Sequence, residues 1–272
     1  MARIKWDQVG EKVYETGTNH GVMYKSNGAA YDAGVAWNGL TGVTDSPSGA
    51  EITSLYADNI KYANLQSAEE WGGTIEAYTY PKEFYECNGV KELAPGVFVG
   101  QQKRKSFGFA YETIKGNDTD GQAYGKKIHV VYGCLTSPSD KSYSTVNDNP
   151  DAVTFSFEVK ATPVTVTGMD PTATVEIDST YTEAGKFQLL ENALFGADGG
   201  NIYTEFTGAA FEKGVVYFER TGTEGAYVYT PTEDTTKQAG TTYYTNGEMV
   251  PTLLMPDEIA ALVGNSANPG NG

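Results

Sequence analysis

Cysteine and histidine are scarce in this sequence: Cys87, Cys134, His20 and His129 are the only ones in 272 residues. Two cysteines are too few for a disulfide framework or a four-cysteine metal site, so we expect synthesis in a reducing compartment. No run of about 18 apolar residues occurs, which argues against a membrane-spanning helix, and the N-terminus lacks the apolar stretch of a secretory signal. We therefore expect a soluble protein with no membrane partner.

Basic residues are also few. The chain has 19 Lys and Arg against 35 Asp and Glu, a formal net charge of −16, of which residues 166–272 contribute −11. Tight, sequence-independent binding to nucleic acid requires a basic surface, so this class of function is not expected. The one basic triplet, Lys103-Arg104-Lys105, is better interpreted as a charged strand entrance or a subunit contact than as a phosphate site.

The abundant residues indicate a mainly β protein. Glycine (32), tyrosine (19) and phenylalanine (11) suit many short strands joined by tight turns. A period of two places Phe107, Phe109 and Tyr111 on one face of a strand. A first hairpin is expected around residues 17–20, a loop at residues 44–49 and a polar, extended excursion at residues 52–66. Strands are predicted over residues 12–16, 21–25, 35–41, 73–79, 106–112, 127–135, 153–160 and 173–177.

Three short helices are expected. The first lies within residues 81–89, which have a proline early and Asn-Gly late. In the second, Thr182 caps a helix that continues to Leu194 and ends before Gly196. Its apolar stripe consists of Phe187, Leu190 and Leu194. The third lies within residues 251–263, and the tail after it, residues 265–272, should be disordered.

Residues 197–248 differ in kind from the rest. The run at 211–218 recurs at 237–244 with Gly214 and Gly240 in equivalent positions, each followed by β-forming residues and paired aromatics. This weak repeat predicts a small antiparallel module. The chain thus divides into a β domain with its following helix (1–196), an inserted β module (197–248), a segment that returns to the first domain (249–264) and a tail (265–272).

No catalytic signature is present. The chain lacks the P-loop, nucleophile-elbow, zinc-protease and dinucleotide-binding motifs, and its two histidines fall in a predicted loop and a predicted strand, which favours structural roles. Residues 117–121 resemble a calcium loop, but Lys127 stands where the bidentate glutamate is required, so a polar turn is the better interpretation. We expect no enzymatic activity, no cofactor and no metal.

Several blocks carry a resemblance to a known family. They are WDQVGEKVYETG at residues 6–17, YADNIKY at 56–62, GTIEAYTYP at 73–81, FGFAY at 107–111, FSFEV at 155–159 and LLMPDEI at 253–259. These blocks resemble the major tail tube proteins of long-tailed, non-contractile bacteriophages (siphophage major tail proteins). The resemblance covers about residues 5–195 and 250–264, and residues 197–248 interrupt it.

The resemblance implies a tail-tube type β-sandwich or barrel with a short flanking helix, to which the small β-rich insert near the C-terminus is added. It implies a virion protein, made in the host cytoplasm, whose hexameric rings stack into the tail tube. Genomic DNA would pass through the lumen during ejection without specific binding, and tape-measure and terminator proteins would be partners. One domain has too few strands to enclose duplex DNA, so such a pore must be shared between subunits, and a ring also covers sheet edges.

In that family the excursion equivalent to residues 44–62 reaches an adjacent ring. The polar composition of residues 44–62 also favours an assembly role, because a stretch with so few apolar residues cannot pack as core. The acidic insert is expected on the outside of the tube, where its charges stay solvated. The inter-ring assembly candidates are Asp45, Ser46, Tyr56, Asp58, Asn59, Lys61 and Tyr62.

Two other functions remain open. The tyrosine-rich repeat would also suit a secreted or surface carbohydrate-binding β-sandwich, although no secretory signal supports it. A tube protein of a contractile tail or secretion machine shares the fold class but requires a sheath partner. Rings or tubes in electron micrographs would favour a tube protein, and dispersed monomers would favour the carbohydrate-binding module.

Overall fold

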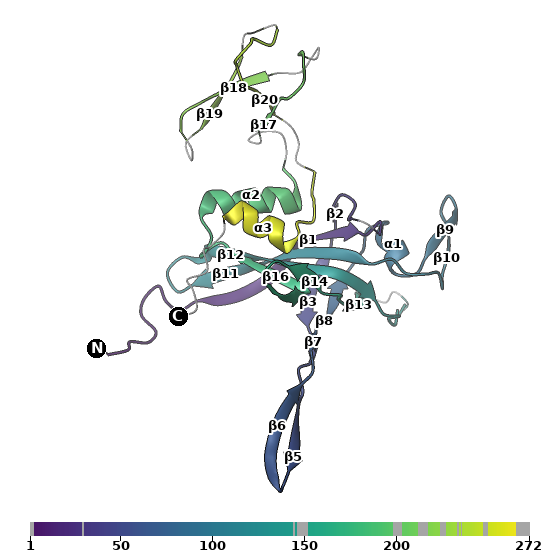
Figure 1. Ribbon diagram of the computed structural model, residues 1–272. Helices are drawn as coiled ribbons and strands as arrows, with labels where there is room; N and C mark the ends of the chain where they lie inside the picture. The colour runs from purple at the N-terminus through teal and green to yellow at the C-terminus, as the bar shows by residue number, and fades with distance from the viewer. Residues whose placement is uncertain are drawn as a thin grey trace.

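The computed structural model describes residues 3–28, 30–143, 145, 152–197, 203–211, 217–223, 227–232, 234, 236–246 and 250–264. Within these residues the protein is mainly β, as expected: a large antiparallel sheet, a few short helices and a small C-terminal sheet of four strands (Figure 1). The predicted tail at 265–272 and Gly214 of the repeat lie outside the described residues.

The large sheet has the order β2-β1-β11-β12-β13-β8-β3, and β16 also pairs with β12. Every pairing in it is antiparallel. Its strands are β1 (Tyr14–Lys25), β2 (Val35–Ala36), β3 (Leu40–Asp45), β8 (Gly72–Ala77), β11 (Phe107–Asn117), β12 (Gly121–Thr136), β13 (Phe155–Lys160) and β16 (Thr174–Asp178).

Strand β12 joins two halves of this sheet. Residues 127–131 pair with β16, whereas Leu135 and Thr136 pair with β13. Between them Gly133 has a φ of 57°, and a Cβ there would lie 2.7 Å from the carbonyl oxygen of Thr162. Only glycine tolerates this backbone and this close approach, so the chain can change direction here.

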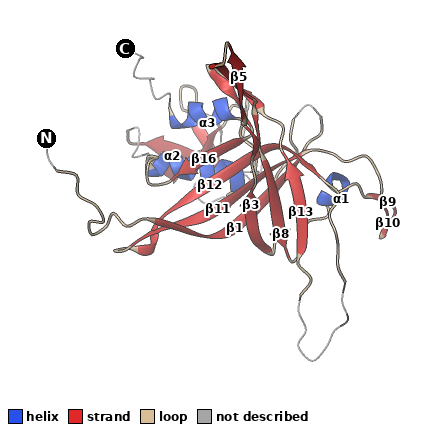
Figure 2. Ribbon diagram, turned by 90° about the horizontal axis from the view of Figure 1, so that it is seen from below, coloured by secondary structure: helices blue, strands red, loops and turns tan. Residues whose placement is uncertain are grey.

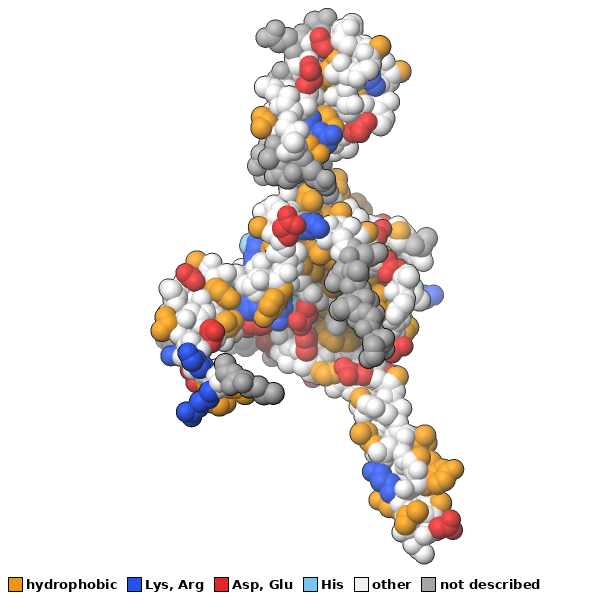
Figure 3. All heavy atoms as spheres, turned by 60° about the vertical axis from the view of Figure 1, so that its left-hand side comes forward, with side chains coloured by type: hydrophobic (Ala, Val, Ile, Leu, Met, Phe, Trp, Pro, Cys, Tyr) orange, Lys and Arg blue, Asp and Glu red, His pale blue; other side chains and the backbone are white. Residues whose placement is uncertain are grey.

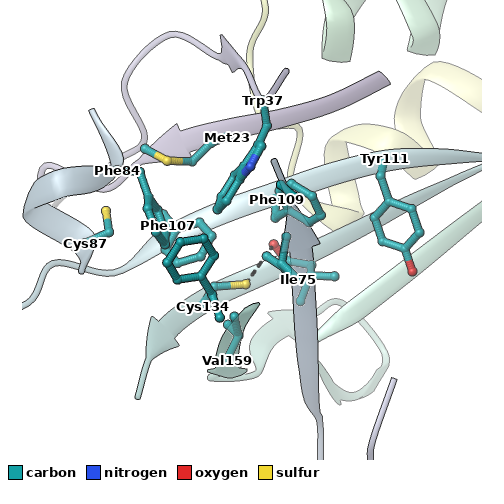
Figure 4. Close-up of a cluster of buried hydrophobic side chains, with 13 residues drawn as sticks. Met23, Trp37, Ile75, Phe84, Cys87, Phe107, Phe109, Tyr111, Cys134 and Val159 are labelled. Atoms are coloured by element: carbon teal, nitrogen blue, oxygen red, sulfur yellow. Dashed lines mark hydrogen bonds between the residues drawn. The ribbon is translucent and has the colours of Figure 1, made fainter. Parts of the chain in front are cut away.

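The first core cluster lies between the two halves. Phe107, Phe109 and Tyr111 all belong to it, which confirms the predicted face of β11, and Phe157 of β13 joins them. The Trp37 ring lies 4.5 Å from the ring of Phe84, measured between centroids, and donates its indole N–H to the Thr79 carbonyl at 3.0 Å. Figure 4 shows these side chains converging from different elements.

The second core cluster lies between the sheet and two helices, α2 (Ala184–Phe195) and α3 (Pro256–Val263). The stripe of Phe187, Leu190 and Leu194 is buried there, as predicted. Tyr24 of β1 donates its hydroxyl to the Leu194 carbonyl. Tyr132 donates to the Leu254 carbonyl at 2.9 Å. The helix α2 ends at Gly196 as expected, but its N-cap residue is Glu183 and not Thr182.

Two strand predictions were wrong. Residues 14–25 form one strand and not a hairpin, because β11 pairs with them along nearly their whole length. Gly17 (φ 66°) and His20 (φ 50°), which favoured a turn, lie instead at two irregularities of that ladder. The run at 35–41 is broken at Gly39 (φ 71°) into β2 and β3. The predicted loop at 44–49 is partly strand, since Asp45 ends β3 and Ser48 begins β4.

Four further strand pairs lie outside the large sheet, and of these β5–β6 and β9–β10 project from the body (Figures 1 and 2). They are β4 (Ser48–Gly49) with β7 (Glu69–Glu70), β5 (Ile52–Ala57) with β6 (Ile60–Gln66), β9 (Lys91–Ala94) with β10 (Val97–Val99), and β14 (Val164–Val166) with β15 (Met169–Thr172). The expected helix in residues 81–89 is α1 (Phe84–Cys87), directly before β9.

The small sheet belongs to the inserted segment and has the order β17-β20-β18-β19. The two copies of the repeat enter it as neighbours, because Phe218 of one pairs with Tyr244 of the other. Tyr217, Tyr243 and Tyr244 are buried within it. Its strands are β17 (Tyr203–Glu205), β18 (Tyr217–Thr221), β19 (Val228–Pro231) and β20 (Tyr243–Asn246).

Candidate assembly surfaces

The hairpin β5–β6, residues 52–66, is called the arm below. Asp58 (φ 51°) and Asn59 (φ 61°) form its two-residue turn, and positive φ at both positions is typical of the type I′ turn that suits a twisted hairpin. The ladder pairs Leu55 with Ala63 and then Tyr56 with Lys61, so Tyr62 is an extra, bulged residue. The arm extends away from the sheet, on the side opposite the small sheet (Figure 1).

The arm presents large apolar side chains to solvent. Tyr62 is 75% exposed and Tyr56 71%, which is unusual for residues that normally form a strand's buried face. Figure 3 shows hydrophobic side chains along the projecting arm at the bottom of the molecule. Many exposed apolar side chains on one projecting element mark a candidate interaction site, although the register divides these between the two faces of the hairpin. The other large apolar side chains exposed on the arm are Ile52, Leu55, Ile60 and Leu65.

The base of the arm is held by backbone bonds. Ser46 donates its N–H to the Gly72 carbonyl at 2.7 Å, and β4 pairs with β7. Gly49 (φ 84°) cannot be replaced there without strain, because a Cβ would lie 2.3 Å from the Ala68 carbonyl oxygen.

Desolvation raises the pKa of the Asp45 carboxyl, and nearby His129 acts in the opposite direction.

The seven sequence-predicted assembly residues fall into two groups. Tyr56, Asp58, Asn59, Lys61 and Tyr62 lie together at the end of the arm, and all five are exposed. Asp45 and Ser46 lie at its base, separated from the tip by the length of β5, about 20 Å for six residues. Sequence reasoning missed Ile52, Leu55 and Ile60: the Asp-Asn pair between two β-forming runs is a signal for the hairpin but not for the exposure of these side chains.

Catalytic chemistry finds little support in the described residues. His20 Nδ1 lies 2.6 Å from the Glu112 carboxylate, and His129 Nε2 lies 2.9 Å from the Thr113 hydroxyl while its ring stacks on Tyr111. Burial raises the pKa of the Cys87 thiol to about 12 and also raises the pKa of Cys134, which suppresses the reactive thiolate. The described residues contain no cluster of three or more His, Cys, Asp or Glu arranged to hold a metal.

The calcium-like sequence at 117–121 is a turn between β11 and β12. The Asn117 side chain accepts from the Thr119 N–H at 3.1 Å and from the Asp120 N–H at 2.5 Å. Asp118 accepts the backbone N–H of Gly10 at 3.0 Å and of Lys12 at 3.3 Å. The polar-turn interpretation is therefore confirmed, and Asp118 anchors the N-terminal segment to this end of the sheet.

Hairpins and the N-terminal segment extend from the body (Figures 1 and 2). Among the described helices, none has the length and apolar character needed to cross a membrane.

Aromatic side chains of the small sheet mostly pack on one another. The ring of Phe211 stacks on that of Tyr217 with centroids 4.0 Å apart, and the ring of Tyr203 stacks on that of Tyr229 at 3.9 Å. Because Tyr217, Tyr243 and Tyr244 are buried, the repeat supplies the interior of this sheet.

Comparison with protein-family models and with curated proteins gives no match to this chain.

Proposed function

We propose that the chain is a structural subunit that assembles with copies of itself into a tube, as the major tail protein of a long-tailed, non-contractile bacteriophage does. In this proposal hexameric rings stack through the arm. The lumen conducts genomic DNA without binding it, tape-measure and terminator proteins are neighbours in the tail, and the virion is the protein's location. The family named in this proposal rests on the sequence resemblance of residues 5–195 and 250–264.

The arm is the observation that carries the proposal. Six large apolar side chains are exposed on one projecting hairpin, and their exposure costs free energy in water that a partner would recover by covering them. The firm attachment of the arm, through the β4–β7 pairing and Gly49, suits an element that transmits a contact to the sheet.

The layered core supports the tail-tube type sandwich within this proposal. The half of the sheet formed by β3, β8 and β13 packs on the half that contains β11, and the helices cover the opposite face of the latter. The body itself is therefore already a packed unit, and assembly would act through its edges and projections. The acidic chain, with a net charge of −16, would repel phosphates rather than hold them.

Electron microscopy of the purified full-length chain tests the proposal, with a shortened arm as the matched variant. Ser54 and Asn64 are paired, so deleting residues 55–63 and joining these two through Asn-Gly preserves the register. The full-length protein should form tubes, and the short-arm variant should remain folded but form no stacked tubes. As a control, Tyr143→Ser changes an exposed residue that lies off the arm and should still assemble.

Three outcomes count against the proposal. Dispersed full-length monomers that bind glycans would favour the carbohydrate-binding alternative, although burial of the repeat tyrosines weakens it. Tubes of normal length from the short-arm variant would show that the arm is not the stacking element. Tubes that recruit a sheath protein would instead favour the contractile-tail alternative.

A further inference from the structure

A polar cavity lies where β1, the turn between β2 and β3, and the second half of α2 meet. Its volume is about 600 Å³, which is in the usual range for a small-molecule site. A second cavity, of about 450 Å³, shares Asn19, Gln188 and Glu191 with the first, so the hollow continues along the helix. The side chains that give the first cavity its character are Asn19, His20, Asn38, Gln188, Asn192 and Phe195.

A bulge in β1 brings two successive residues to this cavity. The ladder with β11 is irregular between Asn19 and Val22, and His20 has a φ of 50° there. Successive residues of a regular strand point to opposite faces, whereas Asn19 and His20 both line the cavity. A left-handed backbone is costly for a residue other than glycine, and such residues cluster at functional sites. The fold thus accepts local strain where it places this pair.

A buried carboxylate orients the His20 ring. The Nδ1 atom lies 2.6 Å from the carboxylate of Glu112, whose side chain is 3% exposed, while the His20 side chain itself is 67% exposed. An ionised carboxylate only accepts, so Nδ1 carries the proton, and in the neutral ring Nε2 keeps a free lone pair. The cavity therefore has an acceptor whose direction is fixed by the sheet.

Further polar atoms at the cavity have no protein partner in the part of the chain that the structure describes. The side-chain oxygen of Asn19 is buried and accepts no hydrogen bond. Gln188 donates its amide N–H groups to Asn192 at 2.9 Å and to Glu191 at 3.2 Å, which leaves the Gln188 oxygen and the Asn192 amide nitrogen unused in these bonds. A buried acceptor without a donor costs free energy that an entering hydroxyl group would recover.

The charges beside the cavity are already paired. Lys126 contacts Glu191 and lies 3.3 Å from the Glu112 carboxylate. Among the described residues that line the cavity none is Lys or Arg, so a phosphate group would find no cation. The described residues also form no cluster of His, Cys, Asp or Glu that could hold a metal. The cavity therefore favours a neutral ligand.

The unused acceptors require a ligand with several donors close together. They are the oxygens of Asn19 and Gln188 and the Nε2 atom of His20. A sugar ring has adjacent hydroxyl groups, whereas a peptide offers one N–H per residue, at a spacing of about 3.5 Å along the chain. Phe195 adds an aromatic ring, 6.4 Å from the His20 ring between centroids, against which the C–H groups of a sugar can pack.

We propose that this cavity binds a short, neutral saccharide whose hydroxyl groups donate to Asn19, His20 and Gln188 while a sugar ring packs against Phe195. The site is separate from the tyrosine repeat, whose aromatic side chains pack on one another in the small sheet. The proposal goes beyond the proposed function and does not depend on it, because one chain supplies the whole cavity.

NMR of the full-length chain with ¹⁵N-labelled histidine tests the site, because the chain has only two histidines. The probes are N,N′-diacetylchitobiose, cellobiose, maltose and lactose, each added up to about 10 mM. At least one of them should shift the ring signals of His20 in a saturable way. His129 is the internal control, since it lines a different cavity and should keep its signals. Triglycine, at the same concentration, should shift neither ring.

Variants with a matched control show whether the saccharide occupies this cavity. Gln188→Ala combined with Asn192→Ala should weaken binding at least tenfold, because the ligand loses hydrogen-bond partners. Leu189→Ala is the control on the same helix, since Leu189 is 50% exposed and lines neither cavity. His20→Asn introduces a residue that tolerates the left-handed backbone, and it should weaken binding similarly.

Four results would overturn the site. They are the absence of a His20 shift with all four saccharides, full binding by the double variant of Gln188 and Asn192, equal loss in Leu189→Ala, and a larger shift with triglycine, which would favour a peptide ligand. Binding that is lost only in Arg220→Ala would also overturn it, because Arg220 lies on the small sheet, 4.2 Å from the Tyr227 ring.

Electron micrographs of the same samples keep this inference separate from the proposed function. Tubes that bind none of the saccharides would refute the cavity as a site and leave the tube proposal intact. Dispersed molecules that bind a saccharide through His20 would support the site and count against the tube.

Discussion

Leu253 lies directly on Gly108. A Cβ at position 108 would be 2.2 Å from Leu253 Cδ2, so the segment before α3 can pack against β11 only because that strand has a glycine there. The aromatic side chains of Phe107 and Phe109 point to the opposite face, into the other core cluster. One strand thus serves two cores, with large residues on one side and small ones on the other.

Gly108→Ala should therefore lower the free energy of unfolding by about 1–3 kcal/mol, as overpacking of a tight core does. Urea denaturation measures the change. Gly100→Ala is the control, since a Cβ there meets no atom within 4 Å, and it should change stability by less than about 0.5 kcal/mol. In the Gly108→Ala background, Leu253→Ala should cost less than it does alone. Full additivity of the two changes would contradict the contact.

Several elements were predicted correctly because no tertiary contact overrode their local sequence pattern. The alternation of Phe107, Phe109 and Tyr111 and the stripe of α2 were both confirmed, because each pattern buries one face whatever its partner is. The hairpin expected around residues 17–20 failed for the opposite reason. Gly17 and His20 have turn-like dihedrals, but β11 continues past them, and a continuous partner converts a turn signal into a bulge.

The candidate site was only partly predictable. The polarity of residues 52–66 indicated that they leave the core, and Tyr56 and Tyr62 are exposed as expected. Ile52, Leu55 and Ile60 could not be assigned to a surface from sequence, because apolar residues in a strand normally indicate burial.

Tyr56→Ser with Tyr62→Ser should abolish the stacking of rings into tubes without unfolding the chain. Both side chains are more than 70% exposed, so the monomer loses little packing, whereas an interface that buries two aromatic anchors loses affinity at least a hundredfold. Sedimentation and electron microscopy measure the effect. Tyr143→Ser is the matched control, since Tyr143 is 73% exposed but lies off the arm. Equal loss in the control would indicate a general effect of removing surface tyrosine.

His129 should make stability depend on pH near neutrality. Burial lowers the pKa of His129, and Lys127 adds to this effect, whereas Glu176, Asp45 and Glu15 oppose it. With a folded pKa below the value of about 6.5 in the unfolded chain, stability is fully present above that value and is lost as pH falls through the folded pKa. Between pH 7 and 5, His129→Gln should reduce the slope of the free energy of unfolding against pH by at most about 1.4 kcal/mol per pH unit. An unchanged slope in denaturant titrations would show that His129 does not titrate as expected.

The inserted segment has a structure of its own. Tyr217, Tyr243 and Tyr244 are buried in its four-stranded sheet, and neither core cluster of the main body contains any of its described residues. The points where it leaves and rejoins the body are close together. Thr252 donates its N–H to the Ala193 carbonyl at 2.7 Å, near the end of α2, and Gly34 donates to the Pro251 carbonyl at 2.8 Å.

Replacing residues 197–248 by a short Gly-Ser linker should therefore leave the body folded and able to assemble. The bond between Thr252 and Ala193 keeps the two junctions within reach of a few residues, and the deletion removes no member of either core cluster. The segment contributes −5 to the net charge, and an acidic module is best placed on the outside, where its charges stay hydrated. Electron micrographs should show tubes of unchanged diameter that lack the outer mass. A folded variant that no longer forms tubes would instead make this segment part of the contact between subunits.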